Sequence, residues 1–416
     1  MSEVTITLLF LVFAVVMFAL EKIPLGLTAV IICVGFILTG ILDAPTAFSG
    51  FVNPTVILFA SLFVIGGALF ETGVASDIGG IVTRFANTER SLIVSVMVIT
   101  VLLSTVLSNT GTAAVMLPVV IGISSKSGVS PSKLLIPMAF SSTIGAMSTL
   151  ISTPANMIGQ NALVEVGLGF RFFEFSILGL PIFLISLVYF AFIGYKFLPD
   201  YKENVLEIQP NVVTKYVPTW RKVLALTILF LTVLGMVFEQ NIGLPVHVIG
   251  VIGAVCMVLF KVIDDKQAYK SIDLQTLFLF GGTLSLAAAL EVTGTGVLIA
   301  DGVIGLLGGN ASPMMFVFAV FSITVLLTNF MSNTATAALI IPISVSIAVQ
   351  MGIDPRLLVM ATIAGTSCTY ITPISTPANV MIIRPGKYKF IHFAKAGIPI
   401  IFITALVTFV LLPIFF

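Results

Sequence analysis

Long apolar stretches, separated by short polar segments, run along almost the whole chain. A helix needs about 20 mostly apolar residues to cross a bilayer. The stretches that can meet this requirement are 4–20, 24–42, 53–70, 133–164, 175–198, 221–238, 245–262, 273–290, 357–383 and 395–414. The first begins at Val4 with no basic segment before it, and we expect it to be a retained span. The pattern predicts an all-α polytopic membrane protein.

Two further apolar stretches, 91–125 and 312–350, have a polar interruption near the middle. In each, the triplet Ser-Asn-Thr separates two arms of about 16 residues, which are short for spans. We predict a re-entrant hairpin in each stretch, with the triplet at its tip.

A different interruption occurs in 133–164 and 357–383, which are too long for single spans. Both contain the sequence Ser-Thr-Pro-Ala-Asn, at 152–156 and at 375–379. Proline has no N–H, so we expect it to break each helix and leave the preceding carbonyl groups free.

These features form an internal repeat, because residues 24–160 overlay on 245–383 at a nearly constant offset. The matches include the two triplets, the two proline breaks after a one-residue slip, and Pro118 with Pro342. Each repeat carries five spans and one hairpin, and an odd number of spans turns the second repeat upside down. We predict a first inverted repeat at 1–200, a cytoplasmic linker at 201–220 and a second repeat at 221–416.

The distribution of basic residues predicts the orientation, because cytoplasmic loops are enriched in Lys and Arg. With the N-terminus outside, only Arg171 and Arg356 of the 19 Lys and Arg residues fall outside, which leaves 17 on the cytoplasmic side. Hairpin 91–125 then enters from the cytoplasm and hairpin 312–350 from outside. The charged stretch 76–92 is predicted to be an interfacial helix. The chain is expected in the plasma (inner) membrane as a multi-pass protein.

Composition narrows the function classes. With 58% apolar and 9% charged residues, the chain does not have the composition of a soluble globular protein. Three cysteines and two histidines show no spacing typical of a disulfide framework or a metal cluster. No nucleophile–base pair is evident, so an enzyme is not expected, and the net charge of +1 gives no indication of nucleic acid as a partner.

The triplets and breaks suggest a binding site. Broken backbone at the bilayer midplane leaves polar groups that must be buried in protein or given a ligand. The free carbonyl groups at a helix end suit a cation, whereas the free N–H groups at a helix start suit an anion. A single Ser-Asn-Thr in a membrane helix is more often interhelical packing, but its repetition favours binding.

The absence of charged residues in these segments limits which ions are expected to bind there. No Asp or Glu lies in the hairpin arms or breaks, so a proton relay has no carrier there, and Na⁺ is the expected cation. No Lys or Arg lies in the hairpin tips or breaks either. A divalent anion would therefore need bound Na⁺ and helix N-termini to offset its charge, which gives a physical reason for coupling.

The paired triplets and paired proline breaks resemble the divalent anion/sodium symporter family, within the wider ion transporter superfamily that also holds citrate, sulfate and arsenite carriers. The likeness covers nearly the whole chain. It implies one Na⁺ site at Ser104, Ser108, Asn109 and Ser152, and a second at Thr328, Met331, Asn333 and Ser375. It implies substrate contacts at Asn109, Thr110, Thr153, Asn333, Thr334 and Thr376. It also implies a homodimer with a fixed scaffold and a transport domain that moves as an elevator.

The chain departs from the family's pattern at two places. Many members have Gly or Ala where this chain has Ser152 and Ser375, and Pro-Pro where it has Pro154-Ala155. This departure weakens the transfer of any particular substrate. The additional first span of longer members is not evident here.

We therefore predict a sodium-coupled secondary transporter of small divalent anions, with a C4-dicarboxylate such as succinate as the favoured substrate. A sulfate or tricarboxylate carrier, or a dicarboxylate exchanger without net sodium coupling, is left open. A cation/proton antiporter, an arsenite permease and an ion channel are less favoured.

Overall fold

The computed structural model describes residues 2–20, 22–74, 88–201, 217–307, 312–373 and 375–416. Their regular structure is entirely helical, which confirms the predicted fold class. The first half contains α1 (Glu3–Leu20), α2 (Leu25–Leu38), α3 (Ala44–Ser49), η1 (Gly50–Val52), α4 (Pro54–Glu71), α6 (Glu89–Ser104), α7 (Asn109–Ser127), α8 (Pro131–Ala146), α9 (Pro154–Glu165), α10 (Ser176–Phe192) and η2 (Gly194–Phe197).

The second half repeats much of this order. It contains α11 (Thr219–Val237), α12 (Glu239–Ile242), α13 (Val246–Leu259), α14 (Asp265–Ser271), α15 (Leu274–Val292), α16 (Thr295–Leu307), α17 (Pro313–Thr328), α18 (Asn333–Met351), α19 (Pro355–Thr366), α20 (Pro377–Gly386) and α21 (Phe390–Phe415). The inversion of the two halves across a membrane remains a prediction.

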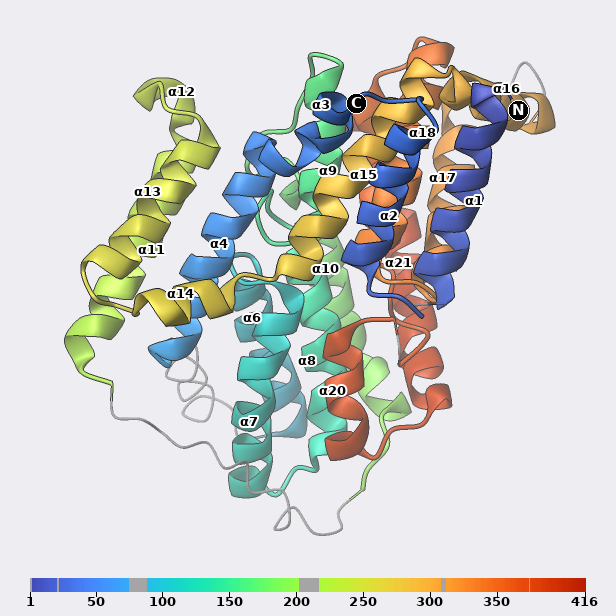
Figure 1. Cartoon of the computed structure of the whole chain (residues 1–416). Coiled ribbons are helices and arrows are strands. Elements are labelled where there is room, and N and C mark those ends of the chain that lie inside the picture. The colour runs from blue at the N-terminus through green and yellow to red at the C-terminus, as the bar shows by residue number, and fades with distance from the viewer. Residues whose placement is uncertain (1, 21, 75–87, 202–216, 308–311, 374) are drawn as a thin grey trace.

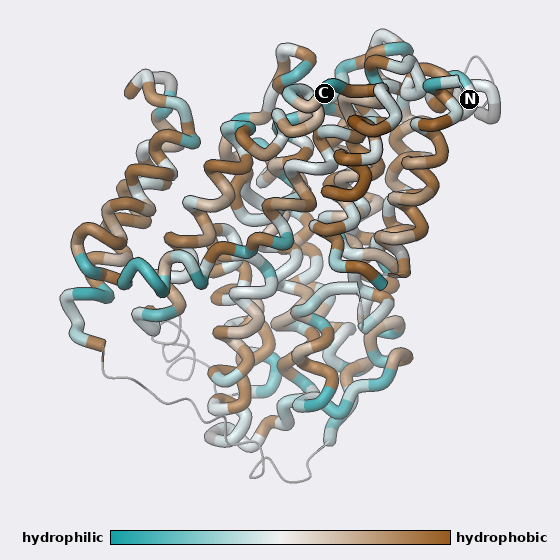
Figure 2. Tube along the Cα trace, viewed as in Figure 1, coloured by the Kyte–Doolittle hydropathy of each residue, from teal (hydrophilic) through white to brown (hydrophobic). Residues whose placement is uncertain are grey.

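Among the described residues, five helical segments are long and apolar enough to cross a membrane: Ala44–Glu71, Thr219–Val237, Leu274–Val292, Asn333–Met351 and Phe390–Phe415. Shorter apolar helices accompany them, including α1, α2 and α13. Large apolar side chains on α1 and α11, such as Val12 and Phe230, are exposed, as on a bilayer-facing surface. Hydrophobic residues predominate along the trace of the helices (Figure 2).

Local sequence explains where the key helices begin and end. α9 and α20 begin at Pro154 and Pro377, because proline suits the first helical position, where no N–H partner is needed. The two long stretches 133–164 and 357–383 are each split in two at these prolines, as predicted. α7 and α18 both end at a glycine in the left-handed conformation.

Each predicted hairpin consists of two helices joined by a short turn, α6–α7 and α17–α18. The first arms have 16 residues, but the second arms have 19, which is longer than expected. The reason is that α7 and α18 already begin at Asn109 and Asn333, inside the triplets, and end one or two residues beyond the predicted arms, with Pro118 and Pro342 inside them. Figure 1 shows α6, α7, α8 and α20 in the lower half of the molecule and α17, α18 and α9 in the upper half.

Two predicted segments lie largely outside the described residues. Of the expected interfacial helix 76–92, residues 75–87 are not described, and Glu89 already belongs to α6. Most of the linker 201–220 is likewise not described.

Helices α8 and α19 occupy the centre of the fold. Every residue of α8 except Lys133 is buried, and so is every residue of α19 except Arg356. Phe140 of α8 packs against Phe393 of α21 and against Tyr370 in the second break. The two broken segments are therefore held in the interior.

Candidate functional site

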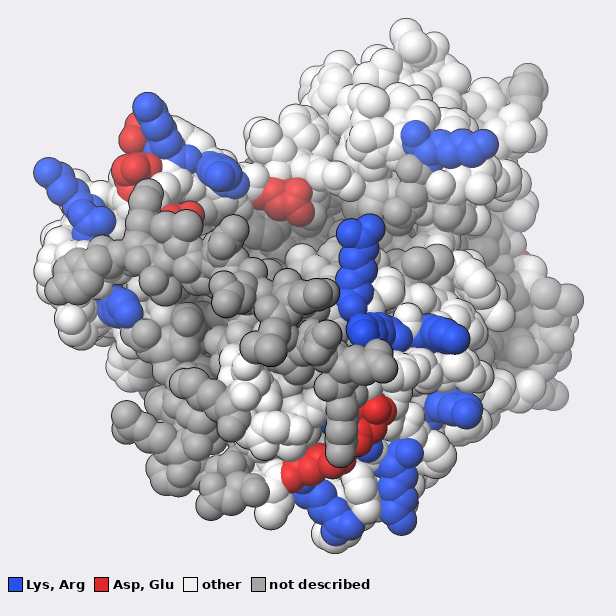
Figure 3. Space-filling model, turned by 90° about the horizontal axis from the view of Figure 1, so that it is seen from below, with Lys and Arg blue, Asp and Glu red and all other residues white. Residues whose placement is uncertain are grey.

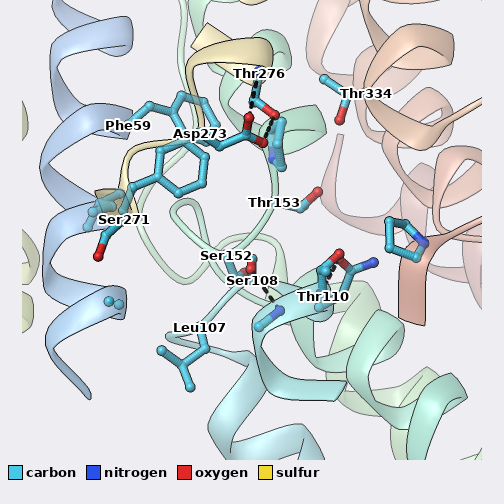
Figure 4. A pocket seen from close by; sticks show the side chains of 18 of the residues that line it. Phe59, Leu107, Ser108, Thr110, Ser152, Thr153, Ser271, Asp273, Thr276 and Thr334 are labelled. Carbon is cyan, nitrogen blue, oxygen red and sulfur yellow. Dashed lines mark hydrogen bonds between the residues drawn. The ribbon is translucent and has the colours of Figure 1, made fainter. Parts of the chain in front are cut away.

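Both hairpin tips and both breaks border one cavity of about 730 Å³. The predicted site residues that line it are Ser108, Asn109, Thr110, Ser152, Thr153, Asn333, Thr334, Ser375 and Thr376. Figure 4 shows Thr110, Thr153 and Thr334 around the same open space. Segments more than 200 residues apart thus meet at one place, as the repeat predicts.

The tips present helix N-termini to this cavity. The Ser108 Oγ accepts a hydrogen bond from the Gly111 N–H at 3.2 Å and caps α7. Ser332 caps α18 in the same way, with the Ala335 N–H at 3.2 Å. These serines satisfy one N–H group each. In α7 the Asn109 Oδ1 also accepts from the Thr110 N–H at 2.7 Å, so fewer N–H groups of its first turn are available.

Ser104 and Thr328 lie behind the tips and do not line the cavity. The Ser104 hydroxyl donates to the Ser142 carbonyl at 2.5 Å, and the Thr328 hydroxyl donates to the Thr366 carbonyl at 3.0 Å. Both side chains are fully buried. Each hydroxyl therefore ties a first arm to the central helix of its own half, while its oxygen keeps acceptor capacity.

Met331 also lies outside the cavity lining. Its side chain is buried in an apolar cluster with Val320 and Leu339. Because Met331 directly precedes Ser332, its backbone groups lie at the tip, and only these could contact an ion there.

The breaks have matching hydrogen bonds in the two halves. The Ser152 hydroxyl is within hydrogen-bonding distance of the Ala146 and Thr149 carbonyls, at 2.5 and 3.1 Å. The equivalent hydroxyl of Ser375 lies 3.2 and 3.0 Å from the carbonyls of Thr369 and Thr372. The structure thus surrounds each break serine with carbonyl oxygens.

Each break is also joined to its own tip, but not equally. In the first half, the Thr149 hydroxyl donates to the Thr105 carbonyl at 2.6 Å. In the second half, the Thr372 hydroxyl donates to the Asn329 carbonyl at 2.8 Å, and the Asn329 side chain adds two further bonds. It donates to the Cys368 carbonyl at 2.9 Å and accepts from the Ile371 N–H at 3.2 Å. The second tip is more firmly attached.

The cavity wall opposite the tips carries charges that the sequence reasoning missed. Glu71, Lys270 and Asp273 line it, from the end of α4, the last turn of α14 and the start of α15 respectively. Asp273 caps α15 and accepts from the Thr276 N–H at 3.2 Å and from its hydroxyl at 2.5 Å (Figure 4). The Gln267 amide donates to Glu71 at 2.8 Å. The sequence signal for this wall is Asp273, the first residue of the apolar stretch 273–290.

Any cation at this site would be held by neutral oxygens and isolated carboxylates. In the described part of the chain, no group of three or more His, Cys, Asp or Glu side chains could hold a metal ion. Hydroxyl, amide and carbonyl oxygens are ligands for small hard cations.

Comparison with known proteins gives the family. Residues 15–365 match the citrate transporter family. The chain is 23% identical to the uncharacterized transporter YfbS of Escherichia coli, over 100% of this chain and 99% of that one. It is 25% identical to the sodium-dependent dicarboxylate transporter SdcS of Staphylococcus aureus, over 93% and 81%.

Solved structures share the fold. The YdaH transporter of Alcanivorax borkumensis matches with a TM-score of 0.66 at 16% identity, over 91% of this chain and 87% of that one. MtrF of Neisseria gonorrhoeae matches with a TM-score of 0.59 at 15% identity, over 100% and 95%. The predicted resemblance to ion transporters, and the prediction that the chain is not an enzyme, are confirmed. The chain is a multi-pass membrane transporter that belongs to the citrate transporter family.

Proposed function

We propose that the protein is a sodium-coupled carrier of small divalent anions, with a C4-dicarboxylate such as succinate as the favoured substrate. The observation that carries the proposal is the single cavity bordered by both Ser-Asn-Thr tips and both Ser-Thr-Pro breaks. Its volume of about 730 Å³ is in the usual range for a small-molecule site. The relative SdcS is described as a sodium-dependent dicarboxylate transporter.

The anion would be held by helix starts and neutral side chains. Four helices begin at residues that line the cavity: α7 at Asn109, α9 at Pro154, α18 at Asn333 and α20 at Pro377. Each start carries a partial positive charge and free N–H groups. The proposed substrate contacts are Asn109, Thr110, Thr153, Asn333, Thr334 and Thr376, whose hydroxyl and amide groups can donate to two carboxylates.

The coupled Na⁺ ions would sit beside the breaks. The proposed ligands are Ser104, Ser108, Asn109 and Ser152 for one ion, and Thr328, Met331, Asn333 and Ser375 for the other. The three ionisable side chains on the wall, one basic and two acidic, do not offset a divalent anion. The cations and helix starts would have to do so, which makes anion affinity depend on Na⁺.

The site could move from one side of the membrane to the other if one wall of the cavity moved relative to the other wall. Tips and breaks form one wall, and α4, α14 and α15 form the other. We propose that the first group moves as an elevator against the second, and that two copies of the chain form a homodimer around the fixed part.

A thermal-shift screen tests the proposal. Purified protein is melted with succinate, α-ketoglutarate, citrate or sulfate, in NaCl and in KCl. A bound ligand stabilises the folded state by about 2.7 kcal/mol at 100 times its Kd. We expect succinate to raise the melting temperature in NaCl but hardly in KCl. If only sulfate or only citrate raised the melting temperature, that anion would replace succinate as the proposed substrate. If a ligand raised the melting temperature equally in NaCl and in KCl, the result would favour an exchanger.

Asp273 supports one competing function, a proton-coupled carrier, because its carboxylate lies in the cavity wall. Uptake into proteoliposomes distinguishes the two. Uptake that follows a pH gradient without Na⁺, and that is lost in Asp273→Asn, would favour proton coupling. Sodium-driven uptake that survives Asp273→Asn would favour the symporter.

A further inference from the structure

An asparagine follows each proline break, and its side chain lies entirely inside the protein. Asn156 in α9 and Asn379 in α20 occupy equivalent positions, two residues after Pro154 and Pro377. Their exposed fractions are 0% and 1%. Neither is among the ligands proposed above, and neither borders the cavity. A buried, duplicated amide behind a binding site calls for a physical explanation.

The side-chain nitrogen of each asparagine gathers the carbonyl groups of its break. The Asn156 Nδ2 donates to the Thr149 carbonyl at 2.7 Å, with the Ala146 and Met147 carbonyls at 3.5 Å. The Asn379 Nδ2 lies 2.8 Å from the Thr369 carbonyl and 3.2 Å from the Thr372 carbonyl. These two amides supply donors to carbonyl groups of the non-helical breaks that follow α8 and α19.

The same carbonyls surround the break serines. Ser152 contacts the Ala146 and Thr149 carbonyls that Asn156 also contacts. Ser375 shares the Thr369 and Thr372 carbonyls with Asn379, whose Nδ2 also lies 3.4 Å from the Ser375 Oγ. The asparagine, the carbonyls and the serine form one connected network in each half, so a change at the asparagine is transmitted to the serine.

The side-chain oxygen of each asparagine has no partner. The Oδ1 atoms of Asn156 and Asn379 are both buried without a hydrogen bond. An unsatisfied buried acceptor lowers the stability of the folded state. Turning the amide over would place Oδ1 against the carbonyl oxygens, so the donor contacts fix its orientation. Because both halves keep an unsatisfied Oδ1, we infer that the Nδ2 groups are needed as donors to the carbonyl groups of the breaks.

We propose that Asn156 and Asn379 are positioning residues of the two sodium sites, one for each site. Each orders the carbonyl groups of its break through Nδ2 and thereby sets the place of Ser152 or Ser375. This inference rests on the proposed sodium coupling. Groups that orient metal ligands typically change metal affinity 10–100-fold when removed. In the sequence, these two residues are recognised as the last residue, Asn, of the repeated motif Ser-Thr-Pro-Ala-Asn.

The test measures how much NaCl is needed for half-maximal succinate binding, by titration calorimetry at fixed ionic strength. Asn156→Leu and Asn379→Leu remove the donor at nearly constant volume, and Asn156→Asp replaces the donor by an acceptor. We expect each to raise the half-saturating NaCl concentration at least about tenfold. Asn156→Ser, which keeps a hydroxyl donor of shorter reach, should give a smaller rise and provides a variant that is easier to fold.

Asn161→Leu is the matched control. Asn161 is a buried asparagine on the same helix, but it bonds to Glu165 at 3.1 Å, away from the break. We expect it to lower the melting temperature and leave the half-saturating NaCl concentration unchanged. The inference is wrong if the Asn156 and Asn379 variants behave like Asn161→Leu, or if Asn156→Asp binds Na⁺ as well as the wild type. Sodium-independent binding by the wild type would instead overturn the proposed function itself.

Discussion

Asn109 and Asn333 are the residues on which the proposed site depends most, because each is assigned to both a cation and the anion. Both line the cavity at the first position of a helix. Their surroundings differ, since the Asn109 Oδ1 accepts from the Thr110 N–H at 2.7 Å, whereas the Asn333 Oδ1 lies 3.3 Å from the Thr328 hydroxyl. The two tips are related but not identical in hydrogen bonding.

We predict that Asn109→Ala and Asn333→Ala each abolish succinate uptake into proteoliposomes. Folding should be little affected, because Ser108 and Ser332, rather than these asparagines, cap the helices. Melting temperature and membrane insertion check the second point. Thr227→Ala, at an exposed position on α11, is the control and should transport normally. Wild-type uptake by either asparagine variant would make the triplets structural.

A second prediction concerns Ser104 and Thr328, whose hydroxyls tie each first arm to α8 or α19. If each also coordinates Na⁺, Ser104→Ala and Thr328→Ala should each remove one coupled ion. Succinate binding measured across NaCl concentrations should then rise less steeply. A loss of about 1–3 kcal/mol in stability with an unchanged Na⁺ dependence would show that the hydroxyls only satisfy carbonyl groups.

Individual residues were predictable where chemistry is repeated in the sequence. The triplets and breaks were found because each occurs twice, and nine of the predicted site residues in them line the cavity. Lys270 and Asp273 were not found, because a single charged residue near the end of a predicted span has many ordinary uses. Their place in the cavity results from the packing of α14 and α15, which the sequence pattern alone does not specify.

At the scale of the helices, a close contact between α6 and α8 positions the first site. A Cβ atom on Gly145 would lie 2.7 Å from the Val101 carbonyl oxygen and 2.9 Å from the Ser104 Cβ. Gly365 has the same role in the second half, where a Cβ would lie 2.8 Å from the Thr324 side chain. Only glycine permits these distances, so each first arm can lie directly against the central helix.

We predict that Gly145→Ala forces α6 away from α8 and costs about 1–3 kcal/mol, the usual range for overpacking. It should also raise the NaCl concentration needed for succinate binding, because Ser104 moves with α6. Gly122→Ala in α7 is the control, since a Cβ there meets nothing within 4 Å. The control should be neutral or slightly stabilising. If Gly145→Ala and Gly122→Ala had the same stability and needed the same NaCl concentration for succinate binding, the contact between α6 and α8 would not position the site.

Helix boundaries show where sequence reasoning succeeds and where it stops. The proline breaks were predicted correctly because proline at a helix start has a local cause. The lengths of α7 and α18 were underestimated, because the whole triplet was assigned to the tip, whereas Ser108 and Ser332 cap helices that already begin at Asn109 and Asn333.

For the whole molecule, the orientation in the membrane stays a prediction, and the positions of the charged residues and of the chain ends show how to test it. The face seen in Figure 3 carries more Lys and Arg than Asp and Glu among its described residues. Both chain ends lie on the opposite side (Figure 1). Arg356, one of the two basic residues expected outside, lies at that side too, because its guanidinium is 5.4 Å from the Phe416 ring.

We predict that a cysteine at Ser2 reacts with an impermeant thiol reagent from outside intact cells, and that a cysteine at Lys389 does not. Both positions are exposed in the structure. The native Cys33, Cys256 and Cys368 are replaced first, and reaction at both sites after permeabilisation is the control. Reaction of the Lys389→Cys variant from outside would reverse the orientation.

The unequal attachment of the two tips has a consequence for the order of events in a transport cycle. Asn329 and Thr372 hold the second tip to its break by three hydrogen bonds, whereas the first tip is held there by the Thr149 hydroxyl. We expect the second tip to keep its shape when empty and the first tip to become ordered only as its ion arrives. Sodium would then fill the second site first. Hydrogen exchange in Na⁺-free buffer should accordingly be faster around Thr110 than around Thr334, and slow exchange at both would contradict this order.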